Sequence, residues 1–237
     1  GLVGSEMCIR DSYRMKLTSL GGGGFRVPLV FKALARDTSP QRVTELRLYD
    51  TDSVRLGVIE KVLAQLAPAL PHAPSVVATT ALPTALAETD FIFLAIRVAG
   101  TRGRALDESM CLARGVIGQE TVGAGGISYA LRGIPVVLDL VEQITQYAPD
   151  AKVINFTNPA GVMTEVMQRR LGDQVVGICD SPVGLARRIL TTLQRAGAAP
   201  ADLGSLFNAD GRIHIGYSGL NHLGSVSYTH LTLPTKR

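Results

Sequence analysis

KLTSLGGGGFRVP, residues 16–28, is the stretch that decides the fold. Its first five residues predict a buried strand, four consecutive glycines follow, and Pro28 suits the first turn of a helix, where its missing N–H costs nothing. A glycine loop between a strand and a helix is typical of dinucleotide-binding folds, because N–H groups at the helix N-terminus cradle a pyrophosphate. Gly21 and Gly23 meet the G-x-G spacing, whereas Arg26 occupies the position of the third glycine.

Asp50 supports the same interpretation. It ends a second predicted strand, where a carboxylate can accept hydrogen bonds from the ribose hydroxyls of a dinucleotide. A carboxylate favours NAD over NADP because it repels a 2′-phosphate, although Arg47 or Arg55 could soften that preference. The alternative is a tight glycine turn with an aspartate that caps the next helix.

Short apolar runs alternate with longer helical patterns, which indicates a parallel sheet wrapped by helices. We therefore predict a Rossmann-like, doubly wound α/β domain. The expected strands cover residues 16–20, 45–49, 75–79, 91–96, 152–156 and 174–179. The expected helices cover residues 28–36, 53–66, 82–88, 127–147, 160–170 and 182–196. Residues 212–218 alternate in polarity, which predicts a half-buried antiparallel strand.

The two ends of the chain share an unusual signature. Residues 7–12, MCIRDS, are encoded by the DNA ATGTGTATAAGAGACAG, and the reverse complement of that DNA encodes VSYTH, residues 226–230. We therefore interpret residues 1–12 and 226–237 as adapter-derived and expect the natural sequence to begin near Met15. The expected organisation is an NAD-binding domain over residues 13–200 and the start of a truncated substrate and metal domain, of α+β type, over residues 201–225.

Composition limits the classes of function. The formal net charge is +4 and 5% of residues are aromatic, without a block of lysines and arginines, so we expect no nucleic-acid partner. The apolar stretches have the length of strands, so we expect no membrane span and no membrane partner. Cys111 and Cys179 are too few for a disulfide framework, which fits a reducing compartment and a cytoplasmic location.

Two polar segments follow the predicted fourth strand. Arg97 emerges at its carboxyl end, where ligands of open α/β sheets bind, and a guanidinium suits a phosphate or carboxylate. The alternative is a surface arginine paired with a local acid. The loop GQETVGAGG (118–126) can approach a substrate closely, or it can serve as a helix entry with Glu120 as a capping acid.

Later strands end in three further candidates. Asn158 presents an amide at the edge of the sheet, as in malate- and lactate-type dehydrogenases, or it caps the following helix. Cys179 ends the sixth predicted strand, and His222 lies among glycines. A thiolate and an imidazole are too few for a closed structural metal site, so this pair predicts an open one. The alternative for Cys179 is a small buried hydrophobe.

These segments together resemble glycoside hydrolase family 4, the NAD- and metal-dependent 6-phosphoglycosidases. The collinear matches are GGGGFRVP (21–28), LYD (48–50), FLAIRVAG (93–100), GQETVGAGG (118–126), FTNPAG (156–161), GICDSP (177–182) and GLNHLG (219–224). The resemblance implies NAD held by Gly21, Gly22, Gly23, Gly24, Phe25, Arg26 and Asp50. It also implies Mn²⁺, or another divalent metal, held by Cys179 and His222, with Arg97 on the 6-phosphate and Asn158 on the sugar.

The resemblance further implies a mechanism outside the two-carboxylate scheme of most glycosidases. Hydride passes from C3 to NAD⁺, the ketone acidifies C2–H, the C1 substituent leaves by elimination, and NADH returns the hydride. Asp180 would protonate the leaving group, as in α-specific members, whereas RVAG and NHLG resemble the β-specific branch. We therefore expect a 6-phospho-β-glucosidase that takes a 6-phosphoglucoside or a phosphorylated disaccharide. A 6-phospho-α-glucosidase or α-galactosidase of the same family is the alternative.

The family's tyrosine base would lie downstream of His222, beyond residue 225. We therefore expect this 237-residue chain to be inactive, and we expect the full-length protein to be a homo-oligomer. A 2-hydroxy-acid dehydrogenase of the malate/lactate type is a second hypothesis, supported by the glycine loop, Asp50 and Asn158. An NAD-sensing module without catalysis is a third.

Overall fold

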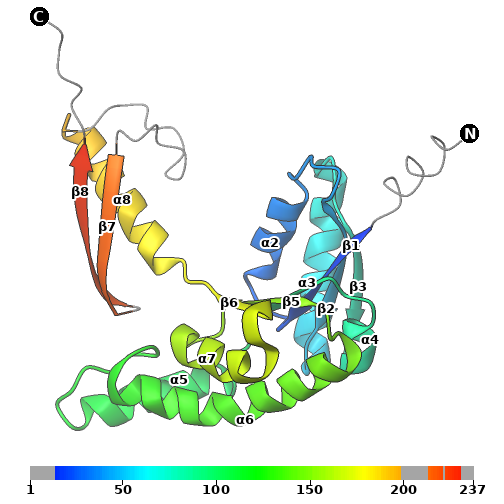
Figure 1. The fold of residues 1–237 in the computed structure, drawn as a ribbon, viewed down its shortest axis with the longest axis horizontal. Helices are drawn as coiled ribbons and strands as arrows, with labels where there is room; N and C mark the ends of the chain where they lie inside the picture. Colours follow the sequence, from blue (N-terminus) through cyan, green and yellow to red (C-terminus); the bar gives the residue numbers. More distant parts are fainter. Residues whose placement is uncertain (1–13, 199–212, 221, 231–237) are drawn as a thin grey trace, which may run out of the picture.

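A six-stranded parallel sheet organises the chain in the computed structural model, which describes residues 14–198, 213–220 and 222–230 (Figure 1). The strands are β1 (Met15–Leu20), β2 (Val43–Tyr49), β3 (Ser75–Thr79), β4 (Phe91–Leu94), β5 (Lys152–Asn155) and β6 (Val175–Gly177). Their order in the sheet is β3-β2-β1-β4-β5-β6. The order reverses between β1 and β4, which makes the carboxyl ends of these two strands the switch point where doubly wound folds bind ligands. The predicted fold class is confirmed.

Helices cover both faces of this sheet. They are α2 (Val27–Leu34), α3 (Ser53–Leu66), α4 (Leu82–Leu86), α5 (Gly100–Leu112), α6 (Gly123–Tyr147), α7 (Ala160–Leu171) and α8 (Ser181–Arg195). Phe31 of α2 and Leu63 of α3 pack on one face, whereas Val137 of α6 and Met163 of α7 pack on the other. The strands supply both cores because successive side chains point to opposite faces.

The predicted bounds of β3 and α3 agree with the structure, whereas α5 was not expected. The buried side of α5 consists of Gly103, Asp107 and Cys111, four residues apart. These side chains are small or charged, so no apolar period marks the helix. Cys111 is buried, so it packs the inner side of this helix.

The sequence predicted no membrane span, and α6 is the helix against which that prediction can be compared. Within the described residues it is the one helix whose length and composition would allow it to cross a membrane. The same properties are typical of a helix in a protein core, and its residues Val137, Val141 and Ile144 are buried in contact with the sheet.

A β-hairpin follows α8 and stands apart from the sheet (Figure 1). Its strands are β7 (Ile213–Leu220) and β8 (Leu223–His230), which pair antiparallel, so the strand predicted over residues 212–218 is confirmed from residue 213 onward. β8 includes residues 226–230, which we interpret as adapter-derived. Leu220 pairs with Leu223, and His222, which lies between these two residues in the sequence, has a positive φ of 139°, as hairpin turns favour.

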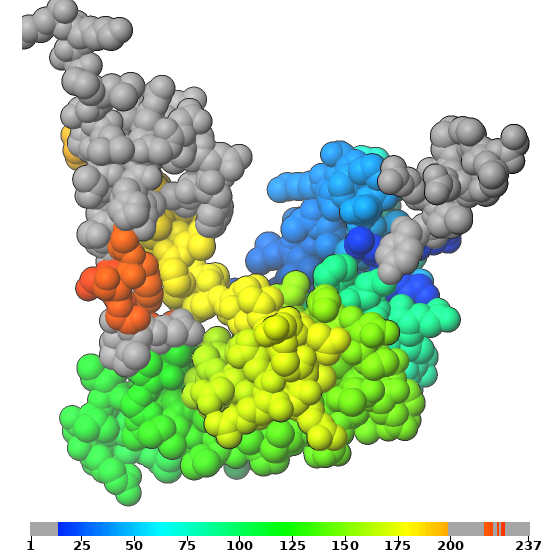
Figure 2. All heavy atoms as spheres, viewed as in Figure 1, coloured from blue at the N-terminus to red at the C-terminus, as the bar shows by residue number. Residues whose placement is uncertain are grey.

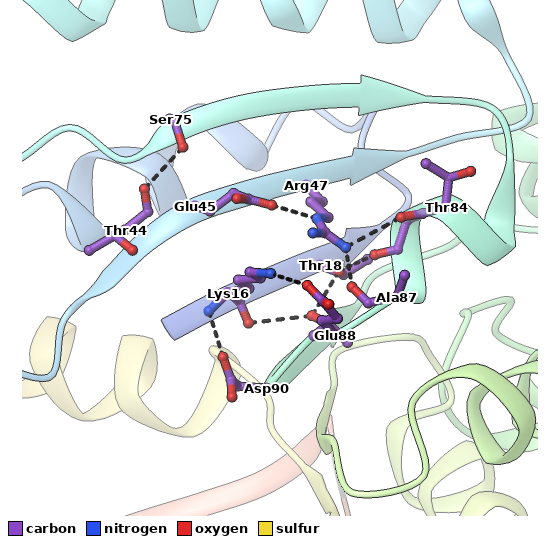
Figure 3. Close-up of polar contacts among 12 residues, drawn as sticks. Lys16, Thr18, Thr44, Glu45, Arg47, Ser75, Thr84, Ala87, Glu88 and Asp90 are labelled. Carbon is purple, nitrogen blue, oxygen red and sulfur yellow. Dashed lines mark hydrogen bonds and ion pairs between the residues drawn. The ribbon is translucent and has the colours of Figure 1, made fainter. Parts of the chain in front are cut away.

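Polar contacts tie the segment after α4 to the first strand (Figure 3). Lys16 Nζ pairs with Glu88 Oε2 at 2.6 Å, and the Lys16 backbone N–H donates to Asp90 Oδ2 at 2.7 Å. The buried Thr18 hydroxyl donates to the Ala85 carbonyl at 2.7 Å. These contacts lie on the side of the sheet away from the carboxyl ends of β1 and β4, which remain open.

Candidate active site

A cavity of about 1150 Å³ lies at the carboxyl ends of the strands, lined by residues that the sequence placed in separate motifs. Figure 2 shows the surface hollowed between α8, in yellow, and α2, in blue. Of the predicted site residues, the following line the cavity: Gly21, Gly24, Phe25, Arg26, Asp50, Arg97, Asn158, Cys179, Asp180 and His222. Gly22 and Gly23 belong to the same loop but are buried, and they do not line the cavity.

The glycine loop passes close to two strand ends, and this explains its composition. Gly21 has a φ of +94°, and a Cβ there would collide with the Ala95 carbonyl. A Cβ on Gly22 would lie 2.8 Å from the Leu48 Cβ. The N–H groups of Gly21 and Gly22 both donate to the Tyr49 carbonyl, at 3.0 and 2.7 Å, which anchors the loop to β2.

The hydrogen bonds of this loop change which N–H groups can meet a pyrophosphate. Gly23 N–H donates to Asp50 Oδ2 at 2.9 Å and Gly24 N–H to the Gly21 carbonyl at 3.0 Å, so all four glycine N–H groups are engaged. Within the described part of the chain, the N–H groups of Phe25 and Arg26 donate no hydrogen bond. These two groups, at the start of α2, are therefore the donors that a phosphate could meet.

Asp50 is not the cap of α3. The N-cap is Asp52, whose carboxylate accepts from the N–H groups of Val54 and Arg55. Asp50 instead accepts from Gly23 and, through Oδ1, from the Asp52 N–H at 3.1 Å. The alternative of a capping Asp50 was wrong, and its carboxylate is fixed at the rim of the cavity between the loop and α3.

The two arginines considered for cofactor preference lie in different places. Arg47 pairs with Glu45 at 2.6 Å and donates to the carbonyls of Thr84, at 3.3 Å, and Ala87 (Figure 3). Its positive charge therefore lies at the carbonyl end of α4, and it does not line the cavity. Arg55 does line the cavity.

Arg26 connects the glycine loop to the segment after β6. Its guanidinium lies over the Phe156 ring, 4.9 Å from the ring centre, and Nη1 contacts Asp180 Oδ2 at 2.8 Å. Asp180 is the N-cap residue of α8 but makes no capping hydrogen bond with its side chain. The expected acid and the expected cofactor loop are thus in direct contact.

Cys179 and His222 meet although they are distant in sequence. Cys179 Sγ lies 3.3 Å from His222 Nε2, and Ser181 Oγ lies 3.1 Å from the same nitrogen. On the other side of the ring, Thr121 Oγ1 lies 3.2 Å from Nδ1. The ring is therefore held with Nε2 directed at the thiol, the orientation that a metal ligand requires.

The donors fit an open metal site better than a closed one. Within the described residues, no three side chains of His, Cys, Asp or Glu gather as a set of ligands. A closed tetrahedral site needs four such ligands, whereas a catalytic site leaves positions for water or substrate. The interpretation of Cys179 as a buried hydrophobe does not account for its place on the cavity wall, half exposed beside an imidazole.

Glycines in the first turn of α6 position Thr121. A Cβ on Gly125 would approach the Gln119 carbonyl to 2.5 Å, and one on Gly126 would approach the Thr121 backbone to 2.6 Å. The loop can therefore fold back onto the start of the helix, where Val122 is the N-cap. This packing confirms the expected helix entry and presents Thr121 to His222.

Glu120 lies at the centre of the remaining polar groups. Its carboxylate pairs with Arg97 at 2.6 Å and with Arg104 at 3.5 Å, and it accepts from Asn158 Nδ2 at 3.3 Å. Burial raises the pKa of Glu120, but the hydrogen bond and charge of Arg97 outweigh burial and hold the pKa below its ordinary value. Glu120 and Asn158 are not the N-caps of the helices that follow them, which are Val122 and Pro159. Arg97 pairs with an acid, as its alternative expected, but it lines the cavity and its partner Glu120 is 23 residues away.

The sequence is similar to that of one family of enzymes. The sequence model of the "Family 4 glycosyl hydrolase" matches residues 16–195. The chain belongs to glycosyl hydrolase family 4. A "Maltose-6'-phosphate glucosidase" of Bacillus subtilis is 34% identical over 86% of this chain and 43% of its own length. A "6-phospho-beta-glucosidase" of Escherichia coli is 34% identical over 73% of this chain and 39% of its own.

A solved family 4 structure supports the fold as well. The 6-phospho-beta glucosidase of Thermotoga maritima, solved with manganese, NAD⁺ and glucose-6-phosphate, has a TM-score of 0.73 and 28% identity, over 89% of this chain and 47% of that one. The chain therefore spans less than half the length of these relatives. Family membership argues against the 2-hydroxy-acid dehydrogenase and the non-catalytic module.

Several residues in and around the cavity were not predicted from the sequence. Asp107 is buried and paired with Arg132, whose hydrogen bond holds the pKa of Asp107 below its ordinary value. Tyr129 lies between Arg97 and Arg132, and burial raises its pKa. Thr121 and Ser181 were quoted only as parts of motifs. Their positions come from contacts over 101 and 41 residues, which no local pattern shows.

Proposed function

We propose that this chain carries the NAD- and metal-binding part of a 6-phosphoglucosidase. One observation carries the proposal: a dinucleotide-type glycine loop and a thiol–imidazole pair line the same cavity. The relatives with matching sequences are 6-phosphoglucosidases, and the Thermotoga maritima enzyme was solved with NAD⁺ and manganese. The substrate would be a 6-phosphoglucoside or a phosphorylated disaccharide.

The cofactor half would bind NAD⁺ through backbone and carboxylate groups. The N–H groups of Phe25 and Arg26 would meet the pyrophosphate, and the free lone pairs of Asp50 would accept from the ribose hydroxyls. A negative charge at this rim supports NAD in preference to NADP. Arg26 would also reach the pyrophosphate if it left Asp180, because its side chain lines the same wall.

The metal half would bind a divalent ion, with Mn²⁺ as our proposal, through Cys179 and His222. When bound, NAD⁺ supplies a hydride acceptor for C3 of the sugar and the metal supplies a Lewis acid for its oxygens. Asn158 would donate to a sugar hydroxyl beside the pair. Arg97 would hold the 6-phosphate, for which it must exchange its contact with Glu120.

Asp180 would deliver a proton to the leaving oxygen. It is exposed at the cavity wall one residue from Cys179, and its carboxylate contacts Arg26 at 2.8 Å. We propose the β-glucoside as substrate from the RVAG and NHLG contexts, and the α-glucoside as the second candidate from Asp180 itself. A cytoplasmic location and a homo-oligomeric full-length protein also remain proposals.

The test uses nitrophenyl 6-phospho-β- and 6-phospho-α-glucosides with the full-length protein. We expect release of nitrophenol only when NAD⁺ and Mn²⁺ are both present, and loss of release in Cys179→Ala. Turnover that survives EDTA and removal of NAD⁺ would contradict the proposal. Net accumulation of NADH with a hydroxy acid would instead favour the dehydrogenase.

A further inference from the structure

Ser181 contributes a hydroxyl to the point where Cys179 and His222 meet. Its Oγ lies 3.1 Å from His222 Nε2, and its backbone N–H donates to Cys179 Sγ at 3.5 Å. The residue lines the cavity and is the first residue of α8. A thiol sulfur and a hydroxyl oxygen therefore both lie within 3.3 Å of the same imidazole nitrogen on the cavity wall.

A single hydrogen bond to His222 Nε2 accounts for only one of these two contacts. The ring nitrogen Nε2 can make one hydrogen bond in the plane of the ring, either as a donor through its N–H or as an acceptor through its lone pair. Two groups, Sγ at 3.3 Å and Oγ at 3.1 Å, compete for that hydrogen bond. Nor does the hydroxyl serve the helix, because α8 has no capping hydrogen bond from a side chain.

The separations match those of neighbouring ligands on one cation. With metal–ligand bonds of about 2.1 Å to nitrogen or oxygen and about 2.3 Å to sulfur, ligands at right angles are about 3.0–3.1 Å apart, and ligands at the tetrahedral angle about 3.4–3.6 Å apart. The Ser181–His222 separation of 3.1 Å fits a right angle, and the Cys179–His222 separation of 3.3 Å falls between the two.

We propose that the Ser181 hydroxyl is a third protein ligand of the divalent metal, an inference that rests on the metal site in the proposed function. Three protein ligands would still leave positions on the metal for water and for hydroxyl oxygens of a sugar. An oxygen donor also favours Mn²⁺ over metals that prefer sulfur-rich sites. Ser181 is thus a binding residue for the metal and not a cap of α8.

Mn²⁺ binding to the 237-residue chain tests this inference without any turnover. Titration calorimetry and the electron paramagnetic resonance signal of free Mn²⁺ would compare the wild type with Ser181→Ala, Cys179→Ala and Thr192→Ala. We expect Ser181→Ala to bind Mn²⁺ roughly 10-fold more weakly, at the lower end of the effects seen around metal sites. Thr192→Ala removes a hydroxyl about three turns further along α8 and should bind like the wild type.

Cobalt separates a direct ligand from a positioning residue. In Ser181→Cys loaded with Co²⁺, a second thiolate on the metal should roughly double the sulfur-to-cobalt charge-transfer absorption, since thiolate is a metal ligand. Wild-type Mn²⁺ affinity in Ser181→Ala, or no added absorption in Ser181→Cys, would overturn the inference while the Cys179–His222 site stands. Mn²⁺ binding that is absent from the wild type or survives in Cys179→Ala would overturn the metal site itself, and the inference with it.

Discussion

The two halves of the cavity are built in different ways. The cofactor half comes from one continuous stretch, β1 through the start of α3, and its contacts are mostly backbone hydrogen bonds such as those of Gly21 and Gly22 to Tyr49. The metal half comes from three segments, and its contacts join side chains, with Thr121 and His222 separated by 101 residues.

The difference determines which changes each half tolerates. A backbone-built loop depends on the absence of Cβ atoms, because the strands leave no space for them. A site built from side chains depends in addition on hydroxyl, thiol and imidazole groups, which a substitution can remove without placing a new atom against the backbone. A variant that adds a Cβ to the glycine loop should therefore change NAD⁺ affinity alone, and a variant that removes a polar group from the metal half should change Mn²⁺ affinity alone.

Gly21→Ala should have the largest effect. The added Cβ would collide with the Ala95 carbonyl, and a φ of +94° is strained for alanine. Such strain costs about 1–3 kcal/mol, so we expect NAD⁺ affinity to fall roughly 10- to 100-fold in calorimetry, with Mn²⁺ affinity unchanged.

Gly57→Ala is the matched control for that variant. Gly57 lies within α3, and a Cβ there would meet nothing within 4 Å. Alanine should therefore raise the free energy of unfolding by about 0.5–1 kcal/mol and leave NAD⁺ affinity unchanged. Equal NAD⁺ affinity in Gly21→Ala and the wild type would show that the loop is not the cofactor site.

The same contrast explains what the sequence could predict. The strand, glycine loop and Asp50 lie within 36 residues of one another, so a local pattern could predict this half of the cavity as a cofactor site and could predict the sheet around it. The sequence did not predict which acceptor each N–H group of the loop binds. Asp50, for example, accepts from the Gly23 N–H instead of capping α3. Cys179 and His222 were predicted as a pair from their residue types and contexts, and the family resemblance supported the pair. Thr121 was not predicted, because its contact with His222 depends on tertiary packing that has no local signature.

Thr121→Val tests the metal half. Valine keeps the shape of threonine but cannot form the hydrogen bond to His222 Nδ1. The imidazole ring would therefore lose the hydrogen bond that fixes its orientation. We expect Mn²⁺ affinity to fall about 10-fold in calorimetry, with NAD⁺ affinity unchanged. Thr121→Ser retains the hydroxyl and should bind Mn²⁺ nearly as well as the wild type; equal loss in both variants would mean that packing, not the hydrogen bond, matters.

Glu120→Gln should have the smallest effect of these variants, and the effect is on the free energy of unfolding. Glu120 lines the cavity and pairs with Arg97, but it belongs to neither the glycine loop nor the Cys179–His222 pair. Because Arg97 holds the pKa of Glu120 below its ordinary value, the charged carboxylate stabilises the fold above that ordinary value. The stabilisation is lost as the pH falls through the lowered pKa of the folded state. With both side chains partly exposed, we expect Glu120→Gln to reduce the free energy of unfolding by about 1 kcal/mol at pH 7.

Urea denaturation at pH 7 and in the acid range measures this difference. The gap between the wild type and Glu120→Gln should narrow in acid, because the wild-type carboxylate becomes neutral there as well. Glu165→Gln is the control, since its pair with Arg169 is a surface contact and contributes about 0.5 kcal/mol or less. A gap that stays constant with pH would mean that Glu120 acts through its hydrogen bond to Asn158 and not through the charge of Arg97.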